Sequence, residues 1–227
     1  MPKLDRDGDV WVLDLGEDEN RFHPDWLTAV AEMIDQVVAT PAPRALVTSA
    51  TGKFWSNGLD LDWLGQNQDK VDGYVAQVHD VFAKVLAAPV PTVAAIQGHA
   101  FAAGAMLTLA HDWRVMRADR GFWCLPEADI HIPFTPGMSA LIQSKLTPAT
   151  QTSAMLAARR FGGEDALAAG IVDATAAEDG VVADAVALAA AQAGKDGATL
   201  GTIKARMYAG ALAALGDRDS NRLMPGV

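Results

Sequence analysis

The residue with the clearest chemical potential is Glu127, which stands in an apolar stretch. Residues 121–137 read GFWCLPEADIHIPFTPG, so aromatic and aliphatic side chains flank the glutamate on both sides. Burial among apolar groups raises a carboxyl pKa because it penalises the charged form. A glutamate tuned in this way can act as a general base near neutral pH. The alternative interpretation is a surface loop that carries the charge without a catalytic role.

Two glycine-containing segments offer a second kind of chemistry. SNGLDL (56–61) and HAFAAGAML (99–107) each follow a predicted strand and lead into a helical segment. The first N–H groups of a helix lack partners within it and carry the positive end of its dipole. Two such starts side by side would direct two N–H donors at one oxygen, which is an oxyanion hole for a carbonyl that becomes an enolate. Close packing through small residues remains the alternative for each segment.

The elements that must position these groups alternate between strand and helix. The patterns predict strands at 10–15, 44–50, 92–98, 113–118 and 168–174, and helices at 23–39, 69–88, 100–112, 135–146, 147–159, 177–193 and 199–214. The segment 51–64 is expected to be a loop that enters a helical turn. Early alternation predicts an α/β fold with mostly parallel strands. The helix-rich end either packs on another subunit or covers the core of its own chain.

Composition excludes several classes of function. The chain has 227 residues, of which 50% are hydrophobic, and this fits one large domain with a sizeable core. A net charge of −10 argues against nucleic acid and anionic membranes as partners. The single cysteine, Cys124, precludes an intrachain disulfide, and its apolar neighbours predict a buried, inert thiol. No signal-peptide pattern opens the sequence and no targeting tail closes it, so a cytoplasmic location is expected.

Several catalytic motifs are absent from the sequence. It contains no G-x-G-x-x-G, no P-loop and no G-x-S-x-G, and no H-E-x-x-H or paired C-x-x-C. We therefore expect neither a metal nor a redox cofactor. The remaining candidates for catalysis are Glu127 and the backbone N–H groups of the two glycine-containing segments.

These motifs resemble those of the enoyl-CoA hydratase/isomerase, or crotonase, family. The run 94–146 carries most of the resemblance, and GKFWSNGLDL (52–61) resembles the family's first oxyanion segment. The segments 20–30 and 147–173 resemble its first helix and the stretch after its active-site helix. Together these segments span nearly the whole chain, from about residue 8 to about residue 210.

The resemblance implies an α/β fold with a crotonase-type ββα spiral core and a helical C-terminal region. On this basis residues 1–165 form the spiral core with the active site, and residues 166–227 form a helical part that takes part in oligomerisation. A homotrimer or a dimer of trimers is expected. The implied substrate is an acyl-CoA thioester, with coenzyme A as part of the substrate and no separate cofactor.

The family pattern also assigns site residues. One oxyanion donor would be the N–H of Leu59, directly after Gly58, and the other the N–H of Ala103, directly before Gly104. Glu127 matches the second of the two glutamates that hydratases of this family carry.

The position of the first glutamate decides between reactions. It holds Met106, which is expected to line the acyl pocket and keep it dry. One base can move a double bond from the 3,4 to the 2,3 position, because it can take a proton from carbon 2 and return one to carbon 4. Adding water is usually served by two acid/base groups. The resemblance is therefore nearest to the enoyl-CoA delta isomerases.

The remaining assignments concern substrate binding. Lys53 is placed to bind coenzyme A, and Lys204 is a second candidate for its nucleotide, although either lysine can be a solvated surface charge. Trp63 and Phe134, together with Leu64, are expected to wall the acyl chain unless they are ordinary core residues.

Two other readings stay open. One is a different acyl-CoA reaction on the same scaffold: hydration, thioester hydrolysis or decarboxylation. Hydration would need Asp129 or another acid in place of Met106, and Asp129 and His131 either assist Glu127 or lie in a turn in water. The other reading is a non-catalytic CoA-binding paralogue that keeps the fold.

Overall fold

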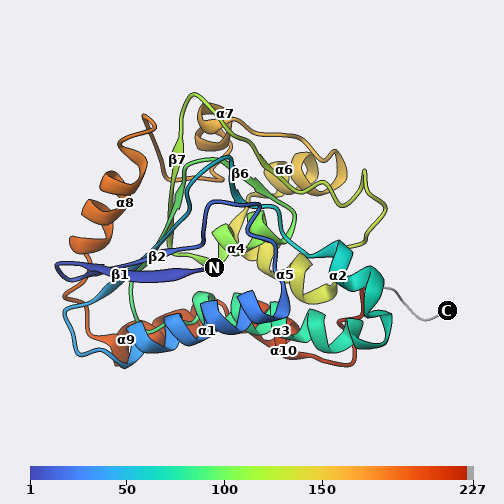
Figure 1. Ribbon diagram of the computed structural model, residues 1–227, viewed down its shortest axis with the longest axis horizontal. Coiled ribbons are helices and arrows are strands. Elements are labelled where there is room, and N and C mark those ends of the chain that lie inside the picture. Colours follow the sequence, from blue (N-terminus) through green and yellow to red (C-terminus); the bar gives the residue numbers. More distant parts are fainter. Residues whose placement is uncertain (224–227) are drawn as a thin grey trace.

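A computed structural model describes residues 1–223 and shows two sheets of mostly parallel strands with helices around them (Figure 1). The strands of the larger sheet are β1 (Lys3–Asp7), β2 (Val10–Asp14), β3 (Ala45–Ser49), β5 (Thr92–Ile96), β7 (Trp113–Arg117) and β9 (Ala174–Ala176). They lie in the order β1-β2-β3-β5-β7-β9, and all neighbours are parallel except β1 and β2. The predicted α/β class with mostly parallel strands is confirmed.

The smaller sheet consists of three short parallel strands. These are β4 (Phe54–Ser56), β6 (His99–Phe101) and β8 (Trp123–Cys124). Each follows a strand of the larger sheet along the chain, so the unit of strand, short strand and helix recurs as a ββα turn. Sequence patterns predicted none of the three, and β6 was wrongly included in a helix, because two or three residues cannot establish a period of two.

Helices follow most of the strands along the described chain. They are α1 (Pro24–Ala39), α2 (Leu61–Gln66), α3 (Val71–Leu86), α4 (Ala103–Ala110), α5 (Pro136–Lys145), α6 (Pro148–Gln151), α7 (Gly163–Ala168), α8 (Val181–Ala190), α9 (Gly197–Met207) and α10 (Ala209–Gly216). A 3₁₀ turn covers Gln68–Lys70 and a π turn covers Thr152–Leu156. The helix predicted at 147–159 is therefore only partly α-helical. The strand predicted at 168–174 is wrong, since α7 ends there and β9 begins at Ala174.

Both faces of the larger sheet are covered. Val47 and Val93 face α8, whereas Leu46 and Ala94 belong to the main core on the opposite face. Successive strand residues point to opposite faces, so a strand covered on both sides is apolar throughout. This explains why β3 and β5 are continuous runs of buried residues.

The C-terminal helices pack on the core of their own chain. α10 lies against α3 and α5, and α3 also lies beside α1; α9, α1, α3 and α10 run along the lower edge of the molecule in Figure 1. The tail thus covers the core, which is one of the two alternatives raised by the sequence. Oligomerisation through residues 166–227 stays a prediction, and residues 224–227 lie outside the described part.

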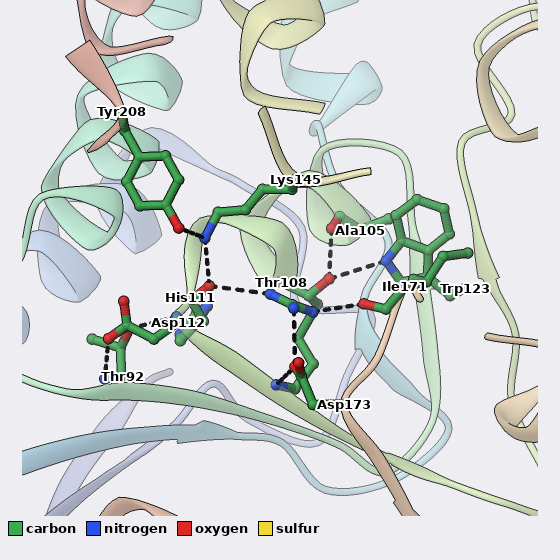
Figure 2. Close-up of polar contacts among 11 residues, drawn as sticks. Thr92, Ala105, Thr108, His111, Asp112, Trp123, Lys145, Ile171, Asp173 and Tyr208 are labelled. Atoms are coloured by element: carbon green, nitrogen blue, oxygen red, sulfur yellow. Dashed lines mark hydrogen bonds and ion pairs between the residues drawn. The ribbon is translucent and has the colours of Figure 1, made fainter. Parts of the chain in front are cut away.

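A buried ion pair and adjoining hydrogen bonds fasten this tail to the core. The Lys204 ammonium on α9 lies 2.6 Å from an Asp112 carboxylate oxygen and donates to the carbonyl of Val90. Figure 2 shows the adjoining contacts, in which Lys145 Nζ donates to the Tyr208 hydroxyl at 2.8 Å. Lys204 is only 3% exposed. Its ammonium is committed to the core, which corrects the expectation of a nucleotide-binding or solvated lysine.

Candidate active site

Glu127 lies in the interior, in the turn that follows β8. The residue is 6% exposed, and its Oε2 atom has no hydrogen-bond partner within residues 1–223. Desolvation by burial raises its pKa to about 7. The carboxyl group therefore exchanges its proton near neutrality, which is what a general base in this pH range requires.

The glutamate opens onto a small, mostly apolar cavity of about 200 Å³. The lining residues are Arg21, Asn57, Leu59, Leu61, Phe101, Ala102, Pro126, Glu127, Ile130 and Ile132. Leu59 and Ala102, which directly precedes the predicted donor Ala103, thus line the same cavity as the Glu127 carboxylate. A second cavity of about 440 Å³ continues past Glu127 and Ile132 to Phe134 and His131.

Two close glycine contacts bring the predicted donor segments together. A Cβ atom on Gly58 would lie 2.8 Å from the backbone nitrogen of Ala103, and Gly58 has a φ of +78° that favours glycine. A Cβ on Gly104 would lie 2.6 Å from the carbonyl oxygen of Ser56. Both positions must therefore lack a side chain if the two segments are to cross at this distance.

The two predicted amide donors have no acceptor among the residues that the structure describes. Among residues 1–223, neither the N–H of Leu59 nor that of Ala103 donates a hydrogen bond. Ala103 is the first residue of α4, so its N–H also lies at the positive end of the helix. Two unused donors beside a buried base can polarise a carbonyl that enters the cavity.

The second donor segment is tied to the strand that precedes the glutamate. Ala102 has a φ of +50°, which is uncommon for a residue with a side chain. Its N–H donates to the carbonyl of Cys124 on β8 at 3.0 Å, and its carbonyl accepts the N–H of Met106. This contact fixes the start of α4 relative to the chain that leads to Glu127.

Met106 lies elsewhere than expected, and Trp63 packs against the main core, which is one of the two alternatives that the sequence left open for it. Met106 is 1% exposed and belongs to the main core, and the residues that line the two cavities at Glu127 do not include it. Its expected place in the acyl pocket is thus corrected, because α4 is buried on every side. Trp63 is half-buried and lies against Tyr74 with ring centroids 5.2 Å apart.

Phe134 and Lys53 lie on different sides of the site. Phe134 lines the second cavity together with Glu127. Lys53 lies over the ring of Phe54 and lines a third cavity, of about 450 Å³, with Arg120 among its neighbours. Lys53 therefore faces a basic cavity that is separate from the one at Glu127.

The other polar residues near the glutamate do not contact its carboxylate. Asp129 and His131 are exposed in the turn, and His131 adopts a φ of +60° where it lines the second cavity. Cys124 is buried, and burial raises its pKa to about 11, so it is an inert thiol near neutral pH.

Some lining residues were not singled out from the sequence. Arg21 and Asn57 line the cavity, and both contact the carboxylate of Glu19, at 2.5 Å and 3.3 Å. The only sequence signal for Arg21 was its place in the segment 20–30 that resembles the family's first helix. Ile130 and Ile132 looked like ordinary apolar neighbours of Glu127.

No helix within residues 1–223 is both long and apolar enough to cross a membrane.

Comparisons with known proteins show which chains this one is similar to. The family model described as enoyl-CoA hydratase/isomerase matches residues 10–218. The chain is 38% identical to enoyl-CoA delta isomerase 3 of Arabidopsis thaliana and 36% identical to the peroxisomal enoyl-CoA delta isomerase 2 of that plant, and each match covers 92% of both chains. The apo structure of an enoyl-CoA isomerase of Mycobacterium tuberculosis superposes with a TM-score of 0.88 at 28% identity, covering 96% of this chain and 95% of that one.

Proposed function

The chain belongs to the enoyl-CoA hydratase/isomerase family, and we propose that it is an isomerase that moves a 3,4 double bond of an enoyl-CoA to the 2,3 position. One observation carries this proposal. A buried glutamate with a pKa of about 7 shares a cavity with two backbone segments, and each segment has an amide, at Leu59 or at Ala103, without an acceptor among residues 1–223. The two relatives that bear the name enoyl-CoA delta isomerase support it.

The proposed reaction needs one base and one oxyanion hole. The thioester oxygen accepts hydrogen bonds from the N–H groups of Leu59 and Ala103. Glu127 removes a proton from carbon 2, and the electron pair delocalises onto that oxygen as a dienolate. The protonated glutamate then delivers a proton to carbon 4, so the double bond ends between carbons 2 and 3. Losing a single oxyanion donor typically costs about 3 to 4 kcal/mol of the barrier.

The absence of a second acid favours isomerisation over hydration. Among the described residues that line either cavity at Glu127, no other Asp or Glu is present. A single carboxylate can serve both proton transfers of the isomerisation. Addition of water would need a partner acid, and neither Met106 nor the exposed Asp129 supplies one inside the cavity.

The substrate class and the assembly are part of the same proposal. The substrate is an acyl-CoA thioester, and no separate cofactor takes part. Lys53 binds the coenzyme A portion from the basic cavity beside the first donor segment. We further propose a homotrimer or dimer of trimers in the cytoplasm, although one relative carries the description peroxisomal.

The test is a direct assay with purified protein. A 3-enoyl-CoA should be converted to the conjugated 2-enoyl thioester, which is followed by its ultraviolet absorbance. Glu127→Gln should abolish turnover and leave ligand binding intact, because the amide keeps the shape but cannot accept a proton. A parallel assay with 2-enoyl-CoA in water detects hydration. Turnover that survives the substitution, or hydration without isomerisation, would overturn the proposal, and ligand binding without any turnover would indicate a CoA-binding paralogue.

A further inference from the structure

We infer that Ser56 is a positioning residue that determines which backbone amide faces the reacting oxygen. The inference rests on the proposed oxyanion hole at Leu59 and Ala103. It concerns a side chain that touches neither cavity at Glu127. Ser56 ends β4 and is completely buried, with 0% of its surface exposed.

The Ser56 hydroxyl makes two hydrogen bonds within the donor segment. Its Oγ donates to the carbonyl of Asn20 at 2.8 Å and accepts the N–H of Gly58 at 3.1 Å. Because a hydroxyl has one hydrogen, the bond to Asn20 fixes its orientation and leaves a lone pair for Gly58. The amide that precedes Leu59 is therefore held in one direction.

The other amides of this segment are also engaged. The N–H of Asn57 donates to the carbonyl of Glu19 at 2.8 Å, and the N–H of Asp60 donates to the Tyr74 hydroxyl at 3.0 Å. Within 57–60, the N–H of Leu59 alone has no acceptor among the described residues. The hydrogen bonds at 57, 58 and 60 thus select Leu59 as the donor that can bind a ligand.

Ser56 also touches the second donor segment. A Cβ on Gly104 would lie 2.8 Å from both Cβ and Oγ of Ser56, so the backbone at the start of α4 rests on this serine. One side chain therefore sets the direction of the Gly58 amide and the distance to the segment that carries Ala103. Both donors of the proposed hole depend on it.

A third segment holds the serine in place. Asn20 is buried with a φ of +48°, and its side-chain amide donates to the carbonyls of Gly16, Phe54 and Trp55 at 3.1, 3.3 and 3.1 Å. The N–H of Phe22 donates to the carbonyl of Gly58 at 2.8 Å. These contacts keep the Asn20 carbonyl where the Ser56 hydroxyl needs an acceptor.

The experiment measures how strongly the oxyanion hole stabilises an enolate, and it does not require turnover. Acetoacetyl-CoA is used as the probe, since a 3-ketoacyl thioester forms an enolate with a near-ultraviolet absorbance when two donors bind its oxygen. Ser56→Ala should lower the equilibrium constant for enolate formation in the bound probe by about tenfold, less than complete loss of a donor. The dissociation constant for hexanoyl-CoA, a saturated thioester, should change less than about twofold.

Two further variants make the result specific. Ser56→Cys keeps a side chain of similar size but offers a weak acceptor, so it should give an intermediate effect, and it decides the question if Ser56→Ala does not fold. Thr150→Ala is the matched control, because it removes another buried hydroxyl, which donates to the carbonyl of Ala169 at 2.8 Å away from the site. It should leave enolate formation at the wild-type value.

The outcomes separate this inference from the isomerase proposal. If the Ser56 variants lose thermal stability but form the enolate like the wild type, or if Thr150→Ala lowers enolate formation equally, Ser56 has only a structural role and the inference is wrong. A wild-type protein that does not ionise the probe also overturns it. A wild-type protein that ionises the probe but does not shift a double bond supports the role of Ser56 and refutes the isomerase.

Discussion

At the scale of single residues, the burial of Glu127 links function to a cost in stability. Its pKa is raised from 4.5 to about 7 by desolvation, so the folded protein prefers the protonated form. Folding is therefore favoured by this group below about pH 4.5, and that contribution is lost as the pH rises through about 7. A pKa shift of this size changes the free energy of unfolding by about 3 kcal/mol. The folded protein is thus less stable when Glu127 is ionised, which is the form that acts as a base, than when Glu127 is protonated.

This predicts that Glu127→Gln stabilises the protein at alkaline pH while it removes activity. At pH 8 the variant should gain up to about 3 kcal/mol in the free energy of unfolding, because no charge is buried. At pH 5 the gain should be much smaller. Denaturant unfolding at both pH values measures it, and equal stability of the two proteins at pH 8 would show that the carboxylate is not desolvated.

At the scale of elements, α4 and the strands around it set the geometry of the site. The N–H of Ala102 binds the Cys124 carbonyl, and the indole N–H of Trp123 donates to Thr108 Oγ1 at 3.0 Å, a contact visible in Figure 2. β8 is therefore joined to both ends of α4. A shift of either element would move the donor at Ala103 relative to Glu127.

The packing of α9 on the core also belongs to this scale, and it predicts that Lys204 stabilises the fold and does not bind coenzyme A. Lys204→Met should destabilise the protein by about 3 kcal/mol, because Asp112 would keep a largely buried charge without its partner. Chemical denaturation measures this loss, and the double variant with Asp112→Asn should recover part of it. KM for the acyl-CoA should stay at the wild-type value. A large rise in KM without loss of stability would return Lys204 to the role of a CoA ligand.

At the scale of the whole molecule, the chain forms one layered α/β unit in which the C-terminal helices cover the core. The described structure contains a single chain, so assembly remains part of the proposal. The expected homotrimer should have a light-scattering mass of three times the 23.9 kDa of the chain, or six times if trimers pair. A monomer at micromolar concentration would contradict the assembly predicted for residues 166–227.

Many features of this protein were predictable from the sequence because they depend on local patterns. The stripe of Trp26, Leu27, Val30, Met33, Ile34 and Val37 predicted α1, and all of these except the half-buried Met33 are buried in it. Continuous apolar runs predicted β3 and β5 within about two residues of their observed ends. The apolar neighbours of Glu127 predicted a perturbed carboxylate. Periodicity, caps and composition act over a few residues, so a single sequence is enough to identify them.

Other features depend on contacts between distant parts of the chain. Three-residue strands such as β6 form only because neighbouring strands align beside them. Met106 has the residue type of a pocket wall, but the layers around α4 place it in the core. The amide of Leu59 is left without an acceptor because Asn20, Ser56 and Tyr74 engage the groups around it. The sequence alone determined which residues could do the chemistry. Only the tertiary structure decided where they meet, because hydrogen bonds and burial across dozens of residues leave no periodic trace in the sequence.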